Sequence, residues 1–324
     1  MKYIMKKQKL SFIFSKGEIS IVRTISERRI SSIRELSTII GKSESSISKT
    51  IKTLEIKGII KINRHGMNKS VCISDNKHAS LLQDLFRNEP YIPWEKILSN
   101  SNMAVLFRNV TNEDSFEYNI SSVNQWRATR NLSMFGMLMS PSNKVPLRNN
   151  NLSLFISEYS DYMSRKYLNK KLPKDAIIIW RRGYRCLFKI KDISKNEVDR
   201  MPANAFPTAV TVFPNYGIRF ITSDSYYYYQ PNLEKLSIED IIIHTLLIDS
   251  ESQTYSIYAL LLAFKNEKDI DIHLLLKKSY EYGIADITRK FIKYIKTNGR
   301  IRKSPLPDKK ELQEIADLYD MVVK

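Results

Sequence analysis

The spacing of apolar residues between positions 19 and 73 restricts the fold of this chain more than any other feature of its sequence. Three successive groups recur at helical intervals: Ile19, Val22 and Ile25; Leu36, Ile39 and Ile40; and Ile47, Ile51 and Leu54. Two later groups alternate as in strands, namely Ile60 and Ile62, then Val71 and Ile73. The pattern predicts three helices followed by two strands.

Residues that start and stop helices stand at the ends of these groups. Ser32 and Glu35 have the spacing of a capping box, and Gly41 can end the helix that follows. Ser43 or Ser45 can cap the third helix, which Gly58 ends. The segment His65-Gly66-Met67-Asn68-Lys69 separates the two strands, so we expect a β-hairpin with a basic tip.

Two runs in this region resemble the MarR-like and archaeal winged helix-turn-helix transcriptional regulators. The first is Arg34-Glu35-Leu36-Ser37, and the second is the whole run from Ser45 to Ile60. The resemblance covers about 55 residues. It implies a winged helix whose third helix enters the major groove of DNA.

The outer face of the third helix carries the predicted DNA-binding residues, because they lie opposite the apolar stripe. They are Ser45, Ser46, Ser48, Lys49 and Lys52, joined at the hairpin tip by Arg64, His65, Asn68 and Lys69. Lysines can bind phosphates or guanine edges, and hydroxyls can bind bases or phosphate oxygens. The alternative is that these are solvated positions of a winged helix that binds protein.

The distribution of charge favours a polyanionic partner. The whole chain has a net charge of +18, and residues 1–77 alone hold 17 Lys and Arg against 6 Asp and Glu, a net +11. Residues 78–168 hold 9 against 8, and residues 169–324 hold 26 against 20. Most of the excess positive charge therefore lies in the first quarter of the chain, as expected of a nucleic-acid-binding module.

A weaker copy of the same unit follows in residues 78–150. When Gly58 is aligned with Gly136, Leu54 meets Leu132, Lys49 meets Arg127 and Lys52 meets Arg130. We therefore expect a helix over residues 121–135, a strand starting near Met137 and an earlier helix over 103–110. This copy could make a second DNA contact through Gln125, Arg127 and Arg130. Trp126, which stands between them in the sequence, could also be an exposed reading residue, but a large aromatic more usually packs against a neighbouring unit.

Residues 151–324 combine helical and strand patterns. We expect a helix over 151–168, then short strands at 176–180, 186–190, 210–213, 219–221 and 226–229. The four tyrosines from Tyr226 to Tyr229 should alternate on a strand, two packed inside and two exposed. From Ser237 onward the sequence is helical, with predicted helices at 237–247, 254–264, 270–282, 284–297 and 308–321.

This last stretch resembles the C-terminal domain of the abortive-infection (AbiEi-like) antitoxin family. The runs that carry the resemblance are Ile238-Glu239-Asp240 with His244-Thr245-Leu246-Leu247, Ala259-Leu260-Leu261-Leu262, Asp271-Ile272-His273-Leu274-Leu275-Leu276 and Tyr280-Glu281-Tyr282-Gly283. They are mostly packing patterns. They imply a shared domain order more than a shared activity.

The sequence contains no complete catalytic or cofactor-binding motif. There is no Walker loop, Rossmann fingerprint or Gly-x-Ser-x-Gly elbow, the four His are isolated, and Cys72 and Cys186 are too few for a zinc site. Asp269 and Asp271 precede a helix, where an acidic cap is more ordinary than a metal pair. We therefore predict no enzymatic activity, no metal and no cofactor.

Together these features predict an α+β, mostly helical chain with three domains: a winged helix (1–77), a second winged helix (78–150) and an α/β domain that senses, dimerises or binds a partner (151–324). The apolar runs are too short to cross a bilayer, and no signal peptide is evident, so we expect a cytoplasmic protein. The predicted function is sequence-specific binding of double-stranded DNA by a homodimeric transcriptional regulator. The alternative is an antitoxin that binds its own promoter and a cognate toxin.

Overall fold

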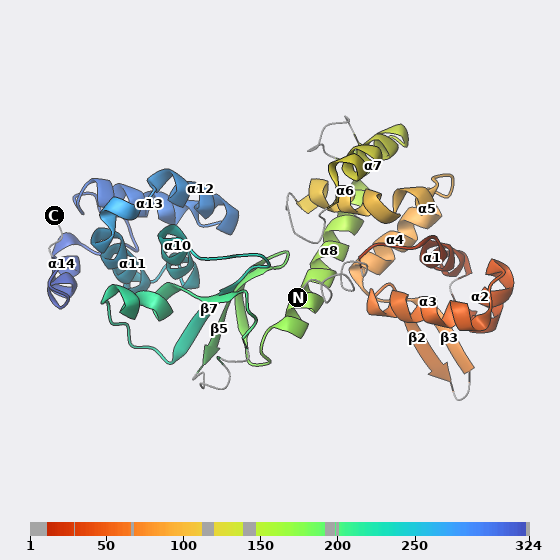
Figure 1. Cartoon of the computed structure of the whole chain (residues 1–324), viewed down its shortest axis with the longest axis horizontal. Helices are drawn as coiled ribbons and strands as arrows, with labels where there is room; N and C mark the ends of the chain where they lie inside the picture. Colours follow the sequence, from red (N-terminus) through yellow and green to blue (C-terminus); the bar gives the residue numbers. More distant parts are fainter. Residues whose placement is uncertain are drawn as a thin grey trace. The chain divides into compact units, whose positions relative to one another are not determined.

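The computed structural model describes residues 12–28, 30–65, 68–111, 120–138, 147–191, 198 and 201–321. The chain divides into two compact units, Met1–Tyr167 (unit 1) and Leu168–Lys324 (unit 2). Helices predominate in both, and each unit contains one small sheet, which confirms the predicted α+β, mostly helical class (Figure 1). The sequence prediction starts the last domain at residue 151, whereas the division between compact units follows Tyr167.

Unit 1 begins with the predicted order of three helices and a hairpin. The elements are α1 (Lys16–Arg28), β1 (Ile30–Ser32), α2 (Ile33–Ile40), α3 (Glu44–Ile56), β2 (Ile60–His65) and β3 (Asn68–Ile73). The short strand β1 was not predicted. It pairs antiparallel with β3, so the sheet has the order β1-β3-β2.

The predicted caps hold these helices in place. The hydroxyl of Ser32 accepts a hydrogen bond from the amide of Glu35, while the Glu35 carboxylate accepts one from the amide of Ser32, which completes the capping box. Ser32 is also the last residue of β1 and pairs with Ser70 of β3. Gly41 ends α2 in the left-handed conformation (φ 69°), and Ser43 caps α3.

The described residues in the rest of unit 1 are mainly helical. They comprise α4 (Lys77–Asn88), α5 (Trp94–Ile97), α6 (Asn100–Thr111), α7 (Ser122–Met134) and α8 (Asn150–Lys171), whose last residues pass into unit 2. The predicted helices at 103–110 and 121–135 are confirmed as α6 and α7, which pack against each other (Figure 1). Beyond α7, among the described residues, Leu138 and Leu147 form an isolated antiparallel bridge near the strand predicted to start at Met137.

Helix α8 supplies aromatic side chains to the interior of unit 1. The Tyr159 ring stacks on Phe155 at 5.6 Å and lies 5.2 Å from the ring of Phe14, which precedes α1. Tyr162 lies 4.4 Å from the ring of His78, a buried residue of α4. These contacts join the first half of α8 to the hairpin-containing part of the unit and explain why the division between units follows this segment.

Unit 2 contains a four-stranded antiparallel sheet. Its strands are β4 (Ile177–Arg182), β5 (Arg185–Lys191), β6 (Ala205–Pro207) and β7 (Asp224–Tyr229), in the order β4-β5-β7-β6. The prediction of strands at 210–213 and 219–221 was wrong. Residues 209–216 form a 3-10 helix, η3 (Ala209–Tyr216), and residues 219–221 have no regular structure, while β6 was missed.

The prediction for the four tyrosines of β7 was also wrong, because all four are buried. β7 lies between β5 and β6, and both of its faces are covered. Tyr226 and Tyr228 belong to the main hydrophobic core of unit 2, whereas Tyr227 faces the other way and stacks on Phe188 at 5.8 Å. Alternation along the strand is preserved, but neither face meets solvent.

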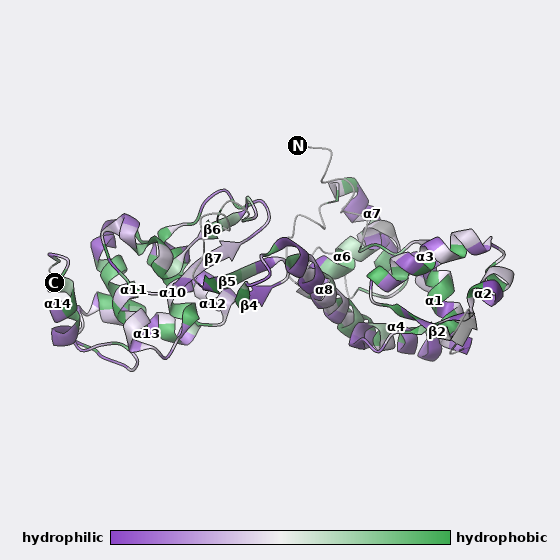
Figure 2. Ribbon diagram, turned by 90° about the horizontal axis from the view of Figure 1, so that it is seen from below, coloured by the Kyte–Doolittle hydropathy of each residue, from purple (hydrophilic) through white to green (hydrophobic). Residues whose placement is uncertain are grey.

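Helices form the remainder of unit 2. They are α10 (Ile238–Ile248), α11 (Gln253–Lys265), the short 3-10 helix η4 (Glu267–Asp269), α12 (Ile272–Tyr282), α13 (Ala285–Lys296) and α14 (Lys309–Asp317), close to the predicted ranges. Hydrophobic residues predominate along α10 and α11, which lie in the core (Figure 2).

Candidate nucleic-acid interface

Helix α3 separates its apolar and polar residues cleanly. Ile47, Ile51 and Leu54 are buried in the interior of unit 1. The predicted DNA-binding residues lie on the other side: Ser45, Ser46, Lys49 and Lys52 are exposed, and Ser48 is half-buried. At 3.6 residues per turn, Ser45, Lys49 and Lys52 fall on one outward face, while the exposed Glu44 and Glu55 lie together along one edge of the buried stripe. The outward face therefore presents hydroxyl and ammonium groups.

The first turn of α3 adds backbone donors to this face. Ser43 accepts a hydrogen bond from the amide of Ser46 (3.3 Å), and residues 43–46 are all exposed. The start of a helix carries partial positive charge and amide groups that its own turns cannot satisfy. An anion such as a DNA phosphate is favoured at this end of α3.

A buried ion pair, which was not predicted from the sequence, holds the last turn of α3. Lys57 Nζ lies 2.6 Å from Glu18 Oε1 of α1 and donates to the carbonyl of Ile13 at 2.7 Å. It also lies 4.7 Å from the centre of the Phe14 ring. Burial lowers the pKa of Lys57, against the opposing effect of Glu18. One feature of the sequence could have indicated this pair: Glu18 stands four residues before Val22, so it lies on the apolar stripe of α1, where a charged residue needs a buried partner.

A pocket of about 320 Å³ lies beside the outward face of α3. Lys49, Thr50 and Thr53 form its wall on the helix, and residues 13–15 face them together with Glu18 and Lys57. The segment before α1 thus borders the candidate surface directly. Residues 13–15 are therefore part of the surface on which a ligand of α3 would rest.

The hairpin is present where the sequence predicts it. β2 and β3 pair from Ile60↔Ile73 to His65↔Asn68. Lys69 is exposed, while the side chains of Arg64, His65 and Asn68 lie outside the described residues. Lys61, nearer the base of the hairpin, pairs with Asp75 at 2.6 Å, and this partner raises the pKa of Lys61.

The second proposed contact surface, on α7, is only partly available. Arg127 and Arg130 are exposed, but Gln125 is half-buried and accepts a hydrogen bond from Arg108 of α6 at 2.7 Å. Trp126 has 60% of its surface exposed, and the Arg130 guanidinium lies 5.5 Å from its ring centre. The structure brings two arginines and one tryptophan together on α7, while Gln125 is engaged within the unit.

Unit 2 places its most polar buried residues in a hydrogen-bonded network. His244 of α10 lies 2.8 Å from the Thr208 hydroxyl through Nδ1 and 3.0 Å from the Tyr282 hydroxyl through Nε2. Burial lowers the pKa of His244 to about 3, so the imidazole is neutral at physiological pH. Lys278 pairs with Asp240 at 2.6 Å, and its hydrogen bond helps to lower the pKa of that carboxyl against the effect of burial. A neutral histidine between two hydroxyls is a packing arrangement with both ring nitrogens satisfied.

Two other residues of unit 2 that could take part in catalysis or metal binding, Asp271 and Cys186, have structural roles. Asp271 caps α12 by accepting from the amides of His273 and Leu274, as its sequence context predicts. Cys186 is buried in β5, and burial raises the pKa of its thiol to about 12. Within the described ranges, no three His, Cys, Asp or Glu side chains come together as a metal site would require.

No helix in the part of the chain that the structure describes is long and apolar enough to span a membrane.

Two regions of the chain match known family models. Residues 13–77 match a family described as HVO_A0114, and residues 203–321 match one described as HVO_2833_C, C-terminal. The first match begins just before α1 and ends at the residue that starts α4. No curated protein and no solved structure matches the chain.

Proposed function

We propose that residues 12–77 form a winged helix that binds double-stranded DNA, and that the protein is a cytoplasmic, sequence-specific transcriptional regulator. In this proposal α3 is the reading helix, and the β2–β3 hairpin is the wing that contacts the adjacent backbone. The observation that carries it is the outward face of α3, where Ser45, Lys49 and Lys52 are exposed together opposite a fully buried apolar stripe.

Charge supports DNA over a protein partner for this face. Residues 1–77 hold a net charge of +11, from 17 basic and 6 acidic residues. Lys57 and Lys61 are engaged with Glu18 and Asp75, whereas neither Lys49 nor Lys52 has an ion-pair partner among the described residues. Exposed lysines without ion-pair partners are suited to phosphate contacts, which supply much of the affinity of such modules for DNA.

The test is the double variant Lys49→Ala/Lys52→Ala. A matched control is Lys293→Ala/Lys296→Ala, because these exposed lysines have the same spacing on α13 and the same total charge is removed. Binding to a set of random-sequence duplexes is measured by fluorescence anisotropy at several salt concentrations. Bound duplexes selected from a random pool by the unmodified protein then give the preferred operator.

We expect the α3 double variant to bind every duplex more weakly and to flatten the slope of log K against log salt by about 0.9 for each lost phosphate contact. The α13 control should keep the slope of the unmodified protein. If the α3 variant remains folded and binds with unchanged affinity and salt dependence, α3 is not the reading helix. Absence of any salt-sensitive duplex binding by the unmodified protein points instead to a winged helix that binds protein.

A further inference from the structure

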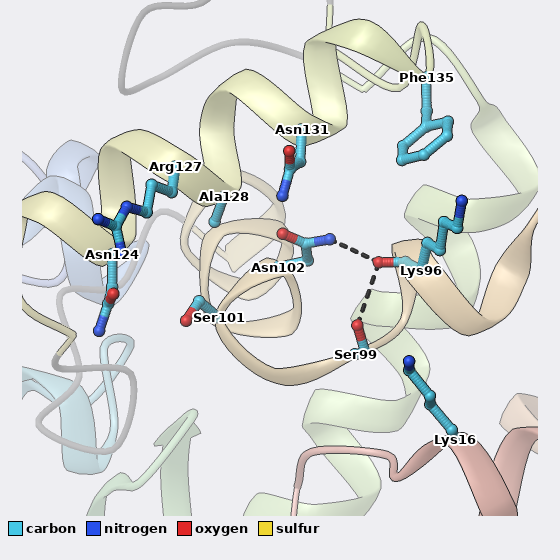
Figure 3. Close-up of a pocket in the computed structure, with 10 residues that line it drawn as sticks. All are labelled: Lys16, Lys96, Ser99, Ser101, Asn102, Asn124, Arg127, Ala128, Asn131 and Phe135. Atoms are coloured by element: carbon cyan, nitrogen blue, oxygen red, sulfur yellow. Dashed lines mark hydrogen bonds between the residues drawn. The ribbon is translucent and has the colours of Figure 1, made fainter.

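A second pocket in unit 1, of about 450 Å³, lies between α6, α7 and the start of α1 (Figure 3). Ten residues line it: Lys16, Lys96, Ser99, Ser101, Asn102, Asn124, Arg127, Ala128, Asn131 and Phe135. The residues from α7 recur at helical intervals and so form one wall. A volume of this size is typical of a small-molecule site.

The lining is basic and contains no carboxylate. Lys16, Lys96 and Arg127 contribute three positive charges and are exposed. Two carboxylates of neighbouring residues are engaged elsewhere: Glu18 pairs with Lys57, and Glu95 pairs with Arg23. The charge in the pocket is therefore available to an anion from solution.

Uncharged polar side chains also line the pocket, and two of them bind the backbone of the turn before α6. Asn102 is buried and donates from Nδ2 to the carbonyl of Lys96 at 2.7 Å, and the Ser99 hydroxyl donates to the same carbonyl at 3.1 Å (Figure 3). These two bonds fix the turn that leads into α6. The amides at the start of α6 lie in the same turn, where partial positive charge adds to that of the lysines.

The cations stand at two ends of the pocket. Figure 3 shows Lys16 and Lys96 at one end with the Phe135 ring, and Arg127 with Asn124 at the other. Asn131 points into the space between them. The end with Lys16 and Lys96 therefore offers two separate ammonium groups and an aromatic ring, and the other end offers a planar guanidinium. A guanidinium can bind a phosphate or carboxylate through two parallel hydrogen bonds.

From this arrangement we propose that the pocket binds a small phosphorylated molecule, with a phosphate between Lys16 and Lys96 and a second anionic group on Arg127. The site is separate from the reading face of α3, because the two pockets share no lining residue. The chain segment before and into α1 connects them, since residues 13–15 line the pocket beside α3 and Lys16 lines this one.

A DNA backbone offers the same phosphate chemistry, so the experiment separates the two sources. The full-length protein is titrated by calorimetry with inorganic phosphate, pyrophosphate and AMP, at fixed ionic strength. The variants are Lys96→Gln and Arg127→Gln. The matched control is Arg130→Gln, because Arg130 is exposed on the same helix but does not line the pocket. Thermal melting checks that each variant is folded.

We expect saturable binding of at least one probe with one site per chain. Lys96→Gln and Arg127→Gln should each weaken it about tenfold or more, since each removes a charge-assisted hydrogen bond. Arg130→Gln should bind like the unmodified protein. An equal loss in the Arg130 variant overturns the proposal, because the binding then follows net charge and not the pocket.

The proposal is also overturned if no probe binds, or if the pocket variants reduce only DNA affinity and its salt dependence, in which case the pocket belongs to the DNA surface. The Lys49→Ala/Lys52→Ala variant should retain the binding of the small probe. A failure of the pocket proposal is thereby distinguished from a failure of the DNA-binding proposal.

Discussion

The ammonium of Lys57 lies 2.6 Å from the carboxylate of Glu18, and both side chains are almost completely buried. The pair joins the last turn of α3 to the first turn of α1. The second oxygen of Glu18 accepts from the amide of Ser15 at 2.6 Å, so the same carboxylate fixes the start of α1. The position of the candidate reading helix thus depends on an interaction that is almost completely buried and therefore only weakly screened by salt.

Breaking this pair from one side should be costly. Lys57→Met leaves the Glu18 carboxylate buried without its partner, and we expect a loss of about 3–5 kcal/mol in the free energy of unfolding. The double variant Glu18→Gln/Lys57→Met removes both charges and should recover a large part of that loss. Urea unfolding monitored by circular dichroism gives both values. Equal losses in the single and double variants contradict a coupled pair.

Replacing Gly58 with alanine should destabilise the protein more than the same replacement at Gly41. Both residues adopt left-handed conformations, with φ of 68° and 69°. A Cβ at Gly58 would lie 2.5 Å from Cζ of Tyr162, whereas nothing lies within 4 Å of one at Gly41. We expect Gly41→Ala to cost about 1–2 kcal/mol from backbone strain alone. Gly58→Ala should cost more, because Tyr162 of α8 must also move; thermal melting of the two variants tests the difference.

Unit 2 should lose stability in acid through His244. Its pKa is lowered to about 3 in the folded protein, against about 6.5 when unfolded, so the unfolded state binds the proton first. The stability is fully present above pH 6.5 and falls as the pH drops towards 3, by about 1.4 kcal/mol per unit over much of that range. His244→Gln should remove this contribution, seen as a shallower pH dependence of the unfolding free energy.

His273→Gln, at an exposed position of α12, is the control for the loss of an imidazole. It should leave the pH dependence of the unmodified protein in place. If the unfolding free energies of the His244 and His273 variants depend on pH in the same way, the buried hydrogen-bonded network is not the origin of the loss of stability in acid.

Replacing Ser46 should change the preference for particular DNA sequences without changing the salt dependence of DNA binding. It is exposed in the first turn of α3, where side chains of a reading helix meet base edges. Ser46→Ala should cost about 1–3 kcal/mol at particular operator positions and leave the salt slope unchanged. Ser80→Ala, exposed in the first turn of α4, should change neither. A uniform loss across all sequences would falsify a base contact by Ser46.

The protein should be a dimer through residues outside 1–77. Winged-helix proteins commonly present two reading helices to half-sites about 34–36 Å apart, which requires a symmetric partner. Sedimentation velocity at micromolar concentration tests this, with and without DNA. A single monomeric species under both conditions contradicts it.

The helices could be predicted from sequence because several local features coincide. In α2 the apolar spacing, the Ser32–Glu35 box and Gly41 all indicate the same segment, and the structure confirms the helix, the box and the left-handed end, although Leu36 alone of the three apolar residues is buried. The same holds for α7, which Ser121 caps and which ends before Gly136. Features within a few residues of one another are visible in the sequence, and tertiary packing here reinforces them.

The predictions that were wrong concern segments whose secondary structure or burial depends on tertiary packing. Residues 210–213 are as apolar as a strand, but Thr211 of η3 accepts from the amide of Tyr226 at 2.7 Å, so the segment packs beside the sheet and does not join it. The burial of all four tyrosines depends on β7 being an inner strand, which alternation cannot reveal. A short apolar run is compatible with either a strand or a helical turn.

The candidate site was partly predictable for the same reason. Exposure of Ser45, Lys49 and Lys52 follows from the helical period once the apolar stripe is known. The pocket between α6, α7 and α1 was not predicted, because Lys16 and Arg127 are far apart in sequence and only the fold brings them to one cavity.

The dual role of Ser32 links the sheet and the helices of the first unit. The same residue pairs with Ser70 in the β1–β3 register and caps α2, so a one-residue slip of β1 would displace the helix start as well. The hairpin and the helices cannot open separately without losing the cap. In native-state hydrogen exchange, the amides of α2 and β3 should therefore exchange through a common opening and report one cooperative folding unit.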